Sequence, residues 1–178
     1  IARELTKWKL DVLLVDKEAD LALQASGRND GEVHPGIDLG KGSLKHKYIR
    51  RANHMYADIC RELDVPFKQV GQYVLFRNSA FKPLVALYVF WRKYHDGIED
   101  TRLISGEELM RREPKLTHDT KFAMYNPSAG CVCPYGLTIA YAENAVQNGA
   151  QVSLNTAVLS MDVSAHQIIN VTTNRGVI

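Results

Sequence analysis

The chain contains few cysteines and no long apolar run, and each shortage excludes a class of protein. Its 178 residues include 3 cysteines, Cys60, Cys131 and Cys133. They are too few and too unevenly spaced for the disulfide framework of a small secreted domain. No apolar run approaches the roughly 20 residues of a membrane-spanning helix. A reducing cytoplasm is therefore the predicted location.

The chain also lacks a large excess of basic over acidic residues. Lys and Arg number 22 against 20 Asp and Glu, which gives a net charge of +2. Nucleic-acid-binding proteins usually carry a distinct positive face, so we expect no nucleic-acid partner and leave anionic small molecules open as ligands. The densest basic stretch alternates with apolar residues at helical spacing, which indicates a solvated helix face; it comprises Lys41, Lys45, Lys47, Arg50 and Arg51.

The first residues are predicted to be the second half of a βαβ unit. Ile1, Leu5 and Trp8 share a helical face, and the apolar run 12–15 that follows is closed by Asp16. A strand that is apolar on both faces belongs in a covered parallel sheet. In a dinucleotide site, an acid at the end of such a strand follows the glycine turn by about 20 residues. That turn would lie before Ile1, which is not an initiating Met, so we expect a piece of a longer chain.

The remaining pattern alternates helices and strands and predicts an α/β fold. Residues 26–42 contain several glycines without any period, which indicates a functional loop. An amphipathic helix is predicted over 44–63. Ser105 is the predicted N-cap of a short helix, and Gly149 the αL cap that closes another. The other predicted helices cover 81–94 and 135–148, and the strands cover 70–76, 101–104, 122–125, 131–133, 151–154, 157–163 and 167–173.

Several conspicuous residues are predicted to be structural. Cys131 and Cys133 lack the second ligand pair of a zinc site, so we expect core packing for both, as for Cys60, and no metal. An aromatic cluster is expected in a helix core or a subunit contact; it comprises Phe81, Tyr88, Phe90, Trp91 and Tyr94. Five histidines are expected to be surface or satisfied core residues: His46, His54, His95, His118 and His166.

Asp16 and the loop that follows it carry a resemblance to a known family. Val15-Asp16-Lys17-Glu18 precedes Ala25-Ser26-Gly27-Arg28-Asn29-Asp30-Gly31-Glu32-Val33-His34-Pro35-Gly36-Ile37. Together they resemble the stretch after the Rossmann motif in FAD-dependent oxidoreductases of the D-amino-acid oxidase and glycerol-3-phosphate dehydrogenase group, and are similar also to L-2-hydroxyglutarate oxidase. The resemblance covers nearly the whole chain, through 42–45, 62–67, 71–75, 127–130, 134–138 and 142–145.

The resemblance implies a fold and a domain division. We expect an incomplete Rossmann-type FAD-binding domain with an inserted α+β segment of a substrate domain. The FAD-binding domain would comprise residues 1–66 and 131–178, and the substrate-domain segment residues 67–130. The glycine turn, and the later strand end that closes the flavin site in the family, do not occur in these residues, so we expect the 178-residue chain to be inactive by itself.

The resemblance also assigns residues to FAD. Asp16 and Lys17 would contact the adenosine half, since a carboxylate can accept hydrogen bonds from ribose hydroxyls. Ser26, Arg28 and Asn29 would line the pyrophosphate and the flavin ring. Gly27 and Gly31 would let the backbone approach a flat ring closely. Without the resemblance, the loop is interpreted as a polar turn, and Asp16 is equally well a strand end.

His34 is the candidate catalytic residue. An imidazole beside a flavin can orient a substrate hydroxyl or accept its proton while hydride leaves the carbon. A structural role for His34 stays open at this point.

The resemblance implies oxidation of a small hydroxy-bearing substrate, such as glycerol 3-phosphate or a similar hydroxy acid or polyol phosphate. The alternatives are an FAD-dependent amino-acid or amine oxidase and a non-catalytic scaffold that lost its flavin. Peripheral membrane attachment and a quinone acceptor stay open for the intact enzyme, and the sequence does not fix the oligomeric state.

Overall fold

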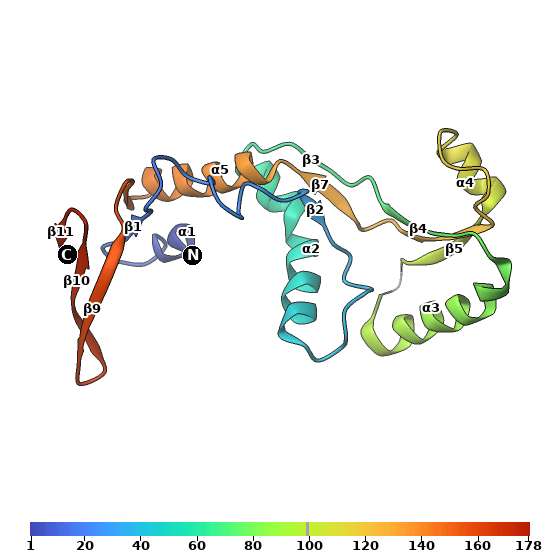
Figure 1. The fold of residues 1–178 in the computed structure, drawn as a ribbon, viewed down its shortest axis with the longest axis horizontal. Coiled ribbons are helices and arrows are strands. Elements are labelled where there is room, and N and C mark those ends of the chain that lie inside the picture. The colour runs from blue at the N-terminus through green and yellow to red at the C-terminus, as the bar shows by residue number, and fades with distance from the viewer. Residues whose placement is uncertain (99) are drawn as a thin grey trace. The chain divides into compact units, whose positions relative to one another are not determined.

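A computed structural model describes residues 1–98 and 100–178, which divide into two compact units. The first unit comprises Ile1–Gly31, Cys60–Pro66 and Cys133–Ile178, and the second comprises Glu32–Ile59 and Phe67–Val132. Figure 1 shows the elements of both. The units depart from the expected segments over residues 32–59, which pack with the second unit. Assigning FAD to one unit and substrate to the other stays a prediction, because packing does not report ligand binding.

The first unit contains a pair of parallel strands. Strand β1 (Leu13–Val15) pairs in parallel with β8 (Gln151–Ser153), as the continuous apolar run 12–15 predicts. Helix α1 (Ala2–Leu5) lies against α5 (Pro134–Gln147). The buried Arg3 joins them, since its Nε donates to Asn144 Oδ1 over 3.0 Å and its guanidinium pairs with Glu62. The main chain adopts the predicted αL conformation at Gly149, with φ of 97°.

An antiparallel sheet completes the first unit. Strands β9 (Val158–Ser164), β10 (Gln167–Thr173) and β11 (Gly176–Val177) follow one another in the order 11-10-9. Figure 1 shows β9 and β10 as a long hairpin. Ala165 and His166 form its turn with φ of 49° and 63°, the left-handed pair of a type I′ hairpin, whose twist matches that of the strands.

The second unit contains an antiparallel sheet with a helix on each face. Strand β6 (Phe122–Asn126) lies between β4 (Gln72–Phe76) and β5 (Arg102–Ser105). Because successive side chains of a strand point to opposite faces, Met124 and Ala123 enter different cores. Met124 packs with Val85 and Val89 of α3 (Lys82–Asp96), and Ala123 with Leu109 of α4 (Gly106–Arg112). The Ser105 hydroxyl caps α4, as predicted.

A smaller sheet and the long helix complete this unit. Strands β2 (Glu32–Val33) and β3 (Phe67–Lys68) pair antiparallel with the two sides of β7 (Gly130–Val132). Helix α2 (Leu44–Glu62) matches the predicted helix closely. The short 3₁₀ helix η1 (Ser79–Phe81) precedes α3. Among the described residues, no helix is both long enough and apolar enough to cross a membrane.

One prediction about packing is wrong for this chain, and one of two alternatives is excluded for another group of residues. Cys131 and Cys133 are exposed, whereas Cys60 is buried as predicted. Cys133 instead caps α5, since its Sγ accepts from the Gly136 amide over 3.4 Å. The aromatic cluster on η1 and α3 is not a core, because its residues are 38% to 70% exposed, and a subunit contact stays a prediction: Phe81, Tyr88, Phe90, Trp91 and Tyr94. Sequence periodicity reports an apolar face but not what covers it.

Candidate functional site

Asp16 lies directly after β1, where its main chain continues the contact with β8. Its amide donates to the Ser153 carbonyl over 3.0 Å, and its carbonyl accepts from the Thr156 amide over 2.8 Å. The carboxylate Oδ1 accepts from the Glu18 amide over 2.9 Å. That hydrogen bond closes a turn and fixes the carboxylate at the carboxyl end of a parallel strand, where open α/β sheets bind ligands.

The loop from Lys17 to Gly31 contains the other predicted cofactor residues. Lys17, Ser26, Arg28 and Asn29 are exposed. The Asn29 amide shapes the loop, because its Nδ2 donates to the Ala25 and Ser26 carbonyls over 3.0 Å each, and its Oδ1 accepts from the Gly31 amide over 2.9 Å. The functional groups that point away from the loop's own backbone are therefore those of Lys17, Ser26 and Arg28.

Glycine is required at both predicted positions of this loop. A Cβ at Gly27 would overlap the Ala22 carbonyl oxygen. Gly31 has φ of 68°, a region that other residues adopt at a cost. The loop is also tied to α5, since the Tyr135 hydroxyl donates to Asp20 over 3.3 Å. The Asp20 carboxylate raises the pKa of Tyr135, because a nearby negative charge disfavours the phenolate.

His34 belongs to the second unit and follows β2. Its side chain is 42% exposed, and its Nδ1 lies 3.6 Å from Glu32 Oε1. Proline and the left-handed Gly36, with φ of 83°, come next, so the chain leaves the strand in an irregular path. Pro35, Gly36 and Ile37 are nevertheless buried. Their carbonyls therefore need partners that regular secondary structure does not supply.

Side chains from α2 and α3 supply those partners, one for each carbonyl from His34 to Ile37. Asn53 Nδ2 donates to the His34 carbonyl over 3.1 Å, and an Arg50 Nη donates to Pro35 over 3.1 Å. Arg92 Nη2 donates to Gly36 over 2.9 Å, and the Tyr88 hydroxyl to Ile37 over 2.5 Å. We call these four carbonyls and their donors the carbonyl clamp. It fixes the backbone beside the candidate base.

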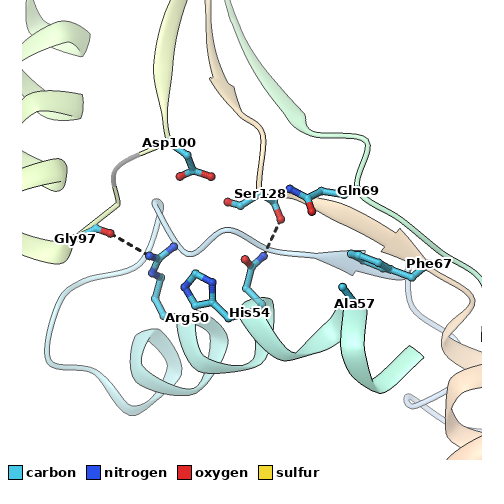
Figure 2. A pocket seen from close by; sticks show the side chains of 9 residues that line it. Arg50, His54, Ala57, Phe67, Gln69, Gly97, Asp100 and Ser128 are labelled. Atoms are coloured by element: carbon cyan, nitrogen blue, oxygen red, sulfur yellow. Dashed lines mark hydrogen bonds between the residues drawn. The ribbon is translucent and has the colours of Figure 1, made fainter. Parts of the chain in front are cut away.

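A cavity of about 460 Å³ opens beside the clamp. Figure 2 shows Arg50 and His54 of α2 on one side of it, with Ser128 and Gln69 on another. A second Arg50 Nη donates to the Gly97 carbonyl over 3.2 Å, so this guanidinium is a structural link and an exception to the predicted solvated basic face. The Ser128 Oγ is buried without a hydrogen bond to the described residues.

The structure groups the predicted site residues by unit. Asp16 and the loop over 17–31 belong to the first unit, and His34 belongs to the second. The other predicted structural histidines are exposed except His46, which is buried with its Nε2 unpaired among the described residues. No group of three or more metal-ligating side chains occurs within residues 1–98 and 100–178.

A known family matches the whole chain, and known proteins match most of it. The family described as "FAD dependent oxidoreductase" (DAO) matches residues 1–178. A glycerol 3-phosphate dehydrogenase of Caloramator mitchellensis is 37% identical over 163 residues, 91% of this chain and 34% of that protein. The mitochondrial L-2-hydroxyglutarate dehydrogenase of Arabidopsis thaliana is 27% identical over 143 residues, 80% of this chain and 29% of that protein.

Solved structures have the same fold. The FAD-bound L-alpha-glycerophosphate oxidase of Mycoplasma pneumoniae superposes with a TM-score of 0.85 at 24% identity, over 97% of this chain and 46% of that one. Glycine oxidase of Bacillus cereus gives a TM-score of 0.85 at 22% identity, over 99% and 48%. The chain thus spans about a third of the curated relatives and under half of these structures.

Proposed function

Since this chain belongs to the family of FAD-dependent oxidoreductases, we propose that the whole protein oxidises a hydroxyl-bearing carbon of glycerol 3-phosphate or a similar hydroxy acid or polyol phosphate. The observation that carries the proposal is the 37% identity over 163 residues with a glycerol 3-phosphate dehydrogenase. The matches to amine-oxidising enzymes at 22% identity or below that level concern the fold alone.

The residues of the first unit fit FAD in their chemistry. Asp16 offers a carboxylate at the end of a parallel strand, and its second oxygen has no hydrogen bond to the described residues. A ribose hydroxyl is a suitable donor to that oxygen. Lys17 and Arg28 are exposed cations that suit phosphate. We propose that these residues and Ser26 hold FAD, while Gly27, Asn29 and Gly31 keep the loop in the conformation that this contact needs.

FAD, when bound, supplies the hydride acceptor. We propose that His34 supplies the base. Its imidazole would accept the proton of the substrate hydroxyl as hydride leaves the same carbon, which becomes a carbonyl carbon. The carbonyl clamp supports this role, because a base held within a fraction of an ångström of its working position loses little entropy on reaction.

The proposal is tested on purified full-length protein. Bound flavin absorbs between about 350 and 500 nm, so a colourless preparation would favour the scaffold alternative. Anaerobic mixing with sn-glycerol 3-phosphate should bleach the flavin, whereas glycine should not. If glycine bleaches the flavin and glycerol 3-phosphate does not, the protein is an amine oxidase instead. Reduction of a soluble quinone by the same preparation tests our further proposal that a quinone takes up the electrons.

A further inference from the structure

A series of hydrogen-bonded polar side chains in the second unit ends at the carboxylate beside His34. Thr101 Oγ1 donates to Asn126 Oδ1 over 2.7 Å, and Asn126 Nδ2 donates to Gln72 Oε1 over 2.8 Å. Gln72 Nε2 donates to Glu32 Oε1 over 2.6 Å. The same Glu32 oxygen lies 3.6 Å from the Nδ1 of His34. We call Thr101, Asn126, Gln72 and Glu32 the polar series.

The fold leaves each amide of the polar series in one orientation. Gln72 and Asn126 are opposite each other in the β4–β6 ladder. The Glu32 carboxylate can only accept, so the Gln72 NH₂ group faces it and the Gln72 oxygen faces Asn126. Asn126 is 0% exposed. Its NH₂ group donates to the Gln72 oxygen, which leaves its own oxygen to the buried Thr101 hydroxyl. Turning either amide over would leave buried polar groups unpaired, a substantial penalty.

From this arrangement we infer that Glu32 is a positioning residue for His34 and that Gln72 holds Glu32 in place. The inference rests on the proposed role of His34 as the base. A carboxylate beside Nδ1 favours the tautomer that carries its proton on Nδ1, which leaves Nε2 as the proton acceptor. The substrate hydroxyl proton then bonds to Nε2. Asn53 already holds the His34 carbonyl, so the carboxylate restricts the motion that the ring retains.

Two substitutions break the series without removing bulk. Gln72→Glu still accepts the hydrogen bond from Asn126 but cannot donate to Glu32. Glu32→Gln keeps the shape of the side chain and removes the anion. Ser79→Glu is the control for the added charge, because Ser79 is exposed in the same unit and its hydroxyl makes no hydrogen bond to the described residues.

The rate of flavin reduction by substrate is measured in full-length protein, with each variant also combined with His34→Ala. Gln72→Glu and Glu32→Gln should each slow reduction at least about tenfold, part of the 10² to 10⁴ that a general base contributes. In the His34→Ala background, each should change the rate less than about threefold, because coupled residues are not additive. Ser79→Glu should match wild type in the first background and the single His34→Ala variant in the second. Equal effects with and without His34 would overturn the inference.

The tautomer of His34 provides a second measurement that needs no substrate. In ¹⁵N-histidine-labelled protein, the His34 signals are those lost in His34→Ala. We expect the Nδ1-protonated tautomer in wild type and a shift toward the other tautomer in Glu32→Gln. An unchanged tautomer would overturn the inference even if the enzyme turns over normally. Wild-type protein that no hydroxy substrate reduces would instead contradict the proposed function, while the tautomer would still decide on Glu32.

Discussion

Replacing Arg92 by Leu should destabilise the second unit more than any exposed substitution on α3. The Arg92 guanidinium is 3% exposed and its Nη1 lies 2.7 Å from the Oδ2 of Asp96, whose side chain is fully buried. The pair is a close ion contact rather than a well-aligned hydrogen bond, because Arg92 Nε and both Asp96 oxygens lack hydrogen-bond partners among the described residues. Arg92 also holds the Gly36 carbonyl of the clamp.

Arg92→Leu leaves the Asp96 charge buried, and among the described residues the one remaining cation within 4 Å is Lys41, at 3.9 Å. Removing one partner of a buried ion pair costs about 3–5 kcal/mol, so we expect a loss of that size in the free energy of unfolding. The double variant Arg92→Leu, Asp96→Leu should recover part of it, since burying two apolar side chains avoids the desolvation of both charges, while the buried Gly36 carbonyl stays without its donor.

Urea unfolding in a Trp8→Phe background, where Trp91 beside Arg92 on α3 is the one tryptophan left among the 178 residues, measures the loss in this unit by fluorescence. The exposed Lys93→Leu is the control on the same helix, and should stay within about 0.5 kcal/mol of wild type. A loss below about 1 kcal/mol in Arg92→Leu would equal that of an exposed ion pair. That result would refute the reasoning that the pair is buried and structural.

Four further predictions concern the site and the cysteines. Asp16→Ala in full-length protein should weaken FAD retention on dialysis, and a variant that keeps stoichiometric FAD with unchanged affinity would remove Asp16 from the ribose contact. His34→Ala should keep folding and FAD content while slowing flavin reduction by about 10² to 10⁴, whereas a rate within about threefold of wild type excludes it as the base. The 178-residue chain alone should bind FAD weakly in a titration, since no phosphate-binding glycine turn precedes β1 within it; submicromolar affinity would contradict this. Iodoacetamide should label Cys131 and Cys133 before Cys60, because Cys60 is buried and burial raises the pKa of its thiol. Peptide mass spectrometry gives the order of labelling. Early labelling of Cys60 would argue against its burial in the core.

The sequence alone predicts those parts of the molecule that local patterns determine. The run 12–15 is apolar at every position, and it forms a parallel strand with Asp16 at its end. Ser105 and Gly149 mark helix ends because capping depends on a few adjacent residues. Patterns of this kind identify an element without reference to distant residues.

The carbonyl clamp and the polar series could not be predicted in this way. The donors to the carbonyls of residues 34–37 lie 15 to 56 positions further along the chain. From the sequence, Arg50 is interpreted as one more cation on a solvated helix face. Gln72 and Asn126 are interpreted as polar residues of strands. Their roles depend on which acceptor the fold brings within about 3 Å, and no local periodicity encodes that distance.

Cys133 illustrates a different reason for a wrong prediction. The strand predicted over 131–133 places Cys131 and Cys133 on one face, because alternate side chains of a strand point the same way. The strand ends at Val132, and Cys133 turns the chain into α5 with its Sγ on the Gly136 amide. A cap residue occupies a position that neither strand nor helix periodicity describes.

Each buried polar group of the second unit lowers the free energy of unfolding unless it has a hydrogen-bond partner. The positions of these partners therefore indicate which segment of the unit is held in one conformation. An apolar core alone would leave the segment over 34–37 free to adopt several conformations, since it belongs to no helix or strand. Four side-chain donors restrict it to one. A catalytic imidazole needs such restriction most, because a displacement of about 1 Å can cost 10²-fold in rate. Under the proposed function, the clamp and the polar series therefore hold His34 in position in addition to stabilising the unit, and variants of the clamp and the polar series should affect rate and stability to unequal extents.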